Sequence, residues 1–121
     1  MRALLTTGLL VLASAANAAA PAKPAPPLTD YERGKCQEVA TISQSIMAAR
    51  QKGVPMAQVL DVFQKAGVGP LITSIQAIAQ DAYSRPQPTA EVDRQKAVAD
   101  FQNEAYASCQ KAWDLAKQPA K

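Results

Sequence analysis

The chain has 121 residues, which is enough for one domain. Its 13 Lys and Arg exceed its 10 Asp and Glu by three, and the two signs are interspersed along the chain. This pattern gives no reason to expect nucleic acid or an anionic membrane as a partner, since both favour clustered basic residues. Histidine is absent, which excludes Ser-His-Asp and Cys-His catalytic sites and removes the commonest metal ligand.

Residues 1–18 are interpreted as a cleaved signal peptide. Arg2 precedes the apolar stretch ALLTTGLLVLA and a run of small residues, in the order that secretory signals follow. Ala16-Asn17-Ala18 supplies an A-x-A cleavage site, and the apolar stretch is shorter than the roughly 20 residues of a membrane span. We therefore expect export to the periplasm, or secretion, without a stable membrane anchor. The alternative is a retained N-terminal anchor.

Residues 19–28 are rich in Pro and Ala, a composition that predicts a disordered, partly polyproline-II lead segment. A helical domain is expected over residues 29–118. Its first helix should begin at a capping box formed by Thr29 and Glu32 and end near Lys52, just before Gly53. Side chains spaced by three and four define its buried stripe: Cys36, Val39, Ser43, Ile46, Met47 and Arg50.

Three more helices follow in the predicted order. Pro55 suits the first turn of a second helix that ends near Ala66. Its apolar face holds Met56, Val59, Leu60 and Phe63. After the Gly-rich break at 67–70, a third helix runs to the prolines at 86 and 88. Its apolar face holds Leu71, Ile72, Ile75, Ile78, Ala79 and Ala82.

The fourth helix is expected over about residues 90–117, with Thr89 as its N-cap. Its stripe holds Val98, Phe101, Ala105, Cys109, Ala112 and Ala116. Period-two alternation is absent from the chain, so no strand is predicted. The expected fold is all-α: a compact four-helix bundle-like domain with two long outer helices and two short inner ones.

The two cysteines are predicted to form one disulfide. In an oxidising compartment, a pair of cysteines in a small exported chain most often does so. If the long helices pack antiparallel, Cys36 and Cys109 both lie about 9–12 Å from the same end of the bundle. They are not a C-x-x-C pair, which disfavours a thioredoxin-like redox role.

Other candidate chemistry is weak, and we expect neither a metal nor a cofactor. Asp100 and Glu104 share a helix face, but the neighbouring Lys96 and Lys111 favour surface ion pairs over a carboxylate site. Met47 and Met56 are interpreted as core residues rather than copper ligands. Trp113 is expected to pack near the disulfide end of the bundle, with a role in anchoring a partner as the alternative.

The chain carries several further marks between Cys36 and Cys109. They are IMAARQ at 46–51 before Gly53-Val54, AY at 82–83 before Pro86, and DFQNEAY at 100–106. In these marks it resembles a group of small, exported, bacterial and phage-associated helical proteins. The resemblance implies an exported helical domain with a Cys–Cys bridge and no established activity. In topology the chain also resembles periplasmic acid-stress chaperones, at the level of class alone.

The polar residues among these marks give a candidate binding cleft of Arg50, Tyr83, Glu104 and Tyr106. The leading hypothesis is a non-catalytic protein-interaction or envelope stress-response module that binds an envelope protein or client. The alternative is a periplasmic carrier of a small apolar ligand, and an enzyme is the least favoured class. The carrier's cleft would be bounded by Met47, Met56, Phe63, Ile75 and Phe101. The sequence determines neither the partner nor the oligomeric state.

Overall fold

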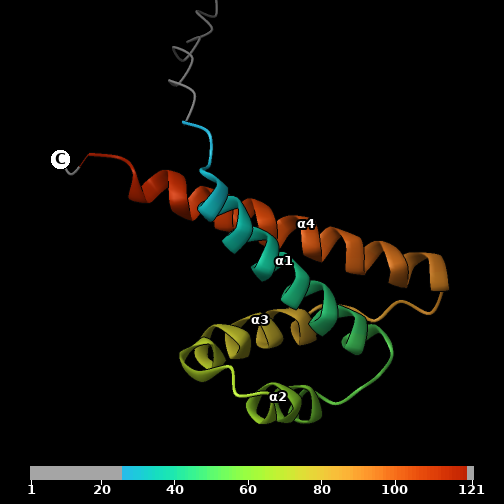
Figure 1. Ribbon diagram of the computed structural model, residues 1–121. Helices are drawn as coiled ribbons and strands as arrows, with labels where there is room; N and C mark the ends of the chain where they lie inside the picture. Colours follow the sequence, from blue (N-terminus) through green and yellow to red (C-terminus); the bar gives the residue numbers. More distant parts are fainter. Residues whose placement is uncertain (1–25, 120–121) are drawn as a thin grey trace, which may run out of the picture.

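The computed structural model describes residues 26–119, and this part of the chain is helical without strands (Figure 1). The elements are α1 (Asp30–Gln51), α2 (Met56–Lys65), the 3-10 helix η1 (Gly69–Leu71), α3 (Ile72–Ser84) and α4 (Glu91–Ala116). The predicted all-α class, with two long and two short helices, is confirmed. The predicted signal peptide, residues 1–18, lies outside the described residues.

The start of α1 follows its local sequence. The Thr29 hydroxyl accepts a hydrogen bond from the Glu32 amide at 3.2 Å, and the Glu32 carboxylate accepts one from the Thr29 amide at 2.8 Å. This reciprocal pair is the predicted capping box. Leu28, assigned by composition to the disordered segment, is instead buried, and its carbonyl accepts a hydrogen bond from Arg33. Ordered packing therefore begins one residue before the helix cap.

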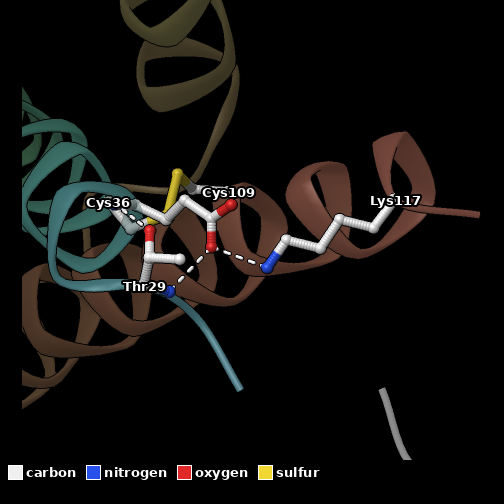
Figure 2. Close-up of a disulfide and its surroundings, with 5 residues drawn as sticks. Thr29, Cys36, Cys109 and Lys117 are labelled. Carbon is white, nitrogen blue, oxygen red and sulfur yellow. Dashed lines mark hydrogen bonds and ion pairs between the residues drawn. A yellow bond between two sulfur atoms is a disulfide. The ribbon is translucent and has the colours of Figure 1, made fainter. Parts of the chain in front are cut away.

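The long helices α1 and α4 run antiparallel (Figure 1). At one end, the Lys117 ammonium lies 2.7 Å from the Glu32 carboxylate (Figure 2). Nearby, Cys36 and Cys109 form the predicted disulfide, with their Cα atoms 5.4 Å apart. The disulfide and the ion pair thus join the first turns of α1 to the last turns of α4.

The core lies where α3 and the middle of α4 meet α1. The seven clustered buried side chains come from all four α-helices: Ile46, Met47, Val59, Ile75, Ala79, Ala82 and Phe101. In Figure 1, α1 lies between α4 and α3, while α2 packs mainly against α3. The predicted apolar faces therefore supply the core.

Three residues of the predicted apolar faces are exposed instead. Leu71 is 47% exposed because it belongs to η1, the turn that precedes α3, rather than to α3 itself. Ala112 and Ala116 are exposed because the last turns of α4 extend past the start of α1 (Figure 1).

The prediction that Thr89 caps α4 is wrong. Ala90 is the N-cap residue, and no side chain caps the helix there. Arg94 instead reaches back over the first turn, where it donates to the Thr89 carbonyl at 2.9 Å and pairs with Glu91 at 2.7 Å. The long Arg94 side chain thus stabilises the first turn of α4, where a threonine hydroxyl was expected to do so.

Candidate functional site: a groove between α3 and α4

An open groove of about 560 Å³ lies between α3 and α4, with α1 at its base. It exists because α3 and α4 both pack on α1 without packing along each other. Short side chains on the facing helices, such as Ala77 and Ala105, leave the space open. The lining is mostly apolar and consists of Val39, Ser43, Ser74, Ala77, Ile78, Asp81, Arg85, Phe101, Glu104, Ala105, Ser108 and Cys109.

The spacing of the lining residues explains how the sequence builds the walls. On α3, Ser74, Ala77 and Asp81 recur at intervals of three and four, so they share one helix face. On α4, Phe101, Glu104 and Ser108 do the same. The groove is therefore a continuous surface on two amphipathic helices.

Arg85 bridges the two walls. One guanidinium nitrogen lies 2.6 Å from Glu104 of α4, and another lies 3.2 Å from Asp81 of α3. The guanidinium carbon also lies 4.7 Å from the centre of the Phe101 ring, within the range of a cation–π contact. The hydrogen bonds that Arg85 donates to Asp81, followed by the one it donates to Glu104, raise the pKa of Arg85 despite the opposing effect of its burial. We call Asp81, Arg85 and Glu104 the Arg85 clasp.

The contribution of the clasp to stability is modest, because the Asp81 and Glu104 side chains are 55% and 53% exposed. Exposed ion pairs contribute about 0.2–1 kcal/mol each. The clasp matters more for the groove, since it places charge at a rim whose remaining lining residues are uncharged.

Ser43 is the polar residue at the base of the groove. Its side chain is fully buried, and its hydroxyl has no hydrogen-bond partner among residues 26–119. A buried hydroxyl without a partner costs about 1–3 kcal/mol relative to one that is satisfied. Ser43 therefore weakens the domain, and its hydroxyl lies buried beneath the groove floor rather than exposed to an occupant.

Two of the predicted cleft residues, Arg50 and Tyr83, meet outside this groove. The Arg50 guanidinium lies 5.5 Å from the centre of the Tyr83 ring and donates to the Arg85 carbonyl at 3.1 Å. The Tyr83 hydroxyl donates to the Val54 carbonyl rather than meeting Arg50. Burial raises the pKa of Tyr83, and the nearby Arg50 charge opposes that shift. These contacts join the α1–α2 link to the end of α3.

The other two predicted cleft residues separate from that pair. Glu104 lies on the groove wall and forms an exposed ion pair, as predicted, but its partner is Arg85 rather than a neighbouring lysine. Lys96 pairs with Asp100 as predicted. Tyr106 is half-buried on α4 and is not among the lining residues of the groove.

Arg85 was not among the predicted site residues. The signal for it was the spacing in DAYSR, where Asp81 and Arg85 stand four apart at the end of a helix and so pair on one face. The contact with Glu104 has no such local signal, because it joins residues of two helices. Ser43 was predicted on the buried stripe, but the missing hydrogen bond at its hydroxyl depends on packing.

The cleft expected for an apolar-ligand carrier is filled by the protein itself. Met47 and Ile75 are buried in the core, and Met56 and Phe63 pack against it. Phe101 is the member of that set that lines the groove. A ligand would therefore have to occupy the groove between α3 and α4, not the space between the predicted residues.

Trp113 packs near the disulfide end, as predicted. Its ring meets that of Tyr31 edge to face, with the ring centres 6.4 Å apart. Within residues 26–119, no group of three or more Cys, Asp or Glu side chains could hold a metal ion. No helix of this range is long and apolar enough to cross a membrane.

No known protein family, curated protein or solved structure matches the chain. The function is therefore inferred from the groove and its surroundings.

Proposed function

We propose that the chain is an exported, non-catalytic protein-interaction module whose binding surface is the groove between α3 and α4. The observation that carries the proposal is the shape of this groove, which is apolar, open to one side and framed by two helices. Sites for small molecules commonly enclose about 70–90% of the ligand surface. An open groove covers one face of its occupant, as grooves that bind an amphipathic helix do.

Two further observations support export as part of the proposal. Residues 1–18 have the order of regions typical of a secretory signal. The Cys36–Cys109 disulfide fits maturation in an oxidising compartment such as the periplasm or the cell exterior. The proposed site of action is therefore the bacterial envelope, with an envelope protein as the partner.

A small apolar ligand is the second candidate occupant. The groove volume of about 560 Å³ lies within the range of about 300–1,000 Å³ found for ligand sites. Native mass spectrometry of the protein purified from the periplasm distinguishes the two candidates. A carrier would retain a bound molecule of defined mass, whereas an interaction module would give the mass of the polypeptide alone.

The proposal is tested with a variant in which a large side chain blocks the groove. Ala77→Trp places a large side chain on the α3 wall, while Ala107→Trp adds the same side chain to an exposed position of α4 that does not line the groove. Both variants serve as bait for co-purification from periplasmic extract, once circular dichroism shows that they fold. A stoichiometric partner that is lost with Ala77→Trp and kept with Ala107→Trp supports the proposal. A partner that both variants retain contradicts the groove as its site.

A further inference from the structure

We propose that the groove binds an apolar segment of another protein that carries one basic side chain, with the basic group placed beside Glu104 and Asp81. This inference rests on the proposed function and adds the chemistry of the partner. It follows from the charges that line the groove.

The charged lining residues of the groove are the three members of the Arg85 clasp. Two carboxylates and one guanidinium leave the rim with one net negative charge, on a chain whose formal net charge is +3. The groove is therefore locally acidic on a protein that is basic as a whole. A segment with a lysine or arginine complements this rim, and an acidic segment is repelled by it.

The clasp carboxylates can receive a further donor. Glu104 and Asp81 are both more than half exposed, so an incoming side chain reaches them without unfolding either helix. Arg85 donates to the Oε2 atom of Glu104, and Oε1 of that carboxylate has no hydrogen-bond partner among residues 26–119. Lysine and arginine side chains form their strongest hydrogen bonds with such carboxylate oxygens.

The uncharged lining residues determine where the partner segment places its apolar side chains. Ile78 and Phe101 supply apolar surface, and the short Ala77 and Ala105 leave room for side chains that enter between the helices. The complementary segment therefore places apolar side chains along the groove and its basic group at the Arg85 end.

The test uses peptides selected without prior choice of sequence. A phage library of random 14-residue peptides is panned on the disulfide-bonded protein, and selected peptides are synthesised and titrated by fluorescence anisotropy. The expected peptides are apolar with a lysine or arginine at a fixed position. Ala77→Trp should abolish their binding, and Ala107→Trp should leave it unchanged.

Two charge variants of opposite sign separate recognition from a structural role. Glu104→Gln removes one negative charge from the rim and should weaken peptide binding by about fivefold. Arg85→Met removes the clasp cation, keeps an apolar stem over Phe101, and should strengthen binding by a similar factor. If the clasp acted only on folding, both variants would weaken binding, and that result would overturn the inference.

Other outcomes tell failure of the inference from failure of the proposed function. Peptides that bind in the groove but carry no basic residue, or an acidic one, overturn the inference and leave the proposed function standing. Peptides whose binding survives Ala77→Trp, or a library without enrichment, count against both. A concentration-dependent dimer that Ala77→Trp abolishes would identify a second copy of the chain as the occupant and overturn the inference.

Discussion

Removal of the disulfide should cost this domain a large share of its stability. The bridge joins residues separated by 73 positions, so it restricts most of the unfolded chain. The chain-entropy relation for a loop of this size gives about 4.4 kcal/mol at 25 °C. A domain of this size has a total stability of about 5–15 kcal/mol. The Cys36→Ala/Cys109→Ala variant should therefore be folded marginally or not at all at 37 °C.

Urea unfolding followed by far-ultraviolet circular dichroism measures the effect. With an m-value of about 1–2 kcal/mol/M, the loss corresponds to a midpoint lower by about 2–4 M urea. The wild-type protein unfolded in the presence of dithiothreitol is the control, and its midpoint should match that of the double variant. A loss below about 1 kcal/mol at an unchanged m-value would refute the reasoning, since the bridge would then not restrict the unfolded chain as its position implies.

Three further predictions concern single side chains. Ser43→Ala should raise the free energy of unfolding by about 0.5–2 kcal/mol, because it removes a buried hydroxyl without a partner and adds a better helix former. A loss of stability would show that the Ser43 hydroxyl has a hydrogen-bond partner. Tyr83→Phe should cost about 1 kcal/mol in urea unfolding through its lost hydrogen bond, whereas Tyr106→Phe should be nearly neutral; equal effects would contradict this. The hydrogen bond from Lys117, followed by that from the Thr29 amide, lowers the pKa of Glu32 below its ordinary value. The ionised Glu32 carboxylate therefore stabilises the fold fully above the ordinary carboxyl range, near pH 4–5, and this stabilisation is lost as the pH falls below that range. In thermal melts from pH 7 to pH 2, the melting temperature of Glu32→Gln should decline less than that of the wild type, and equal declines would refute the linkage.

The features predicted correctly from sequence are those that local chemistry or helical periodicity decides. The capping box depends on two residues three apart, and both of its hydrogen bonds form. The disulfide was predicted from a pair of cysteines in an exported chain, and the antiparallel arrangement of the two long helices places Cys36 beside Cys109. Each inference needed only the path of one helix or the pairing of two.

The features that could not be predicted from the sequence depend on how separate helices pack against one another. The contact of Arg85 with Glu104 and Phe101 exists because α3 ends opposite the middle of α4, an arrangement that no local pattern encodes. Thr89 fits the preference for an N-cap, yet Ala90 occupies that position and Arg94 secures the turn. The groove exists because α3 and α4 do not pack along each other, so its position could not be predicted from the sequence of either helix alone.

The most direct test of the binding surface is a map of amide chemical-shift changes in the ¹⁵N-labelled, disulfide-bonded protein as a selected basic peptide is added. Binding in the groove predicts that the largest changes fall on α3 from Ser74 to Ser84 with its C-cap residue Arg85, and on α4 from Phe101 to Cys109. Changes centred on α2, or on the end of the bundle where Tyr31 meets Trp113, would contradict the groove as the surface through which this protein acts.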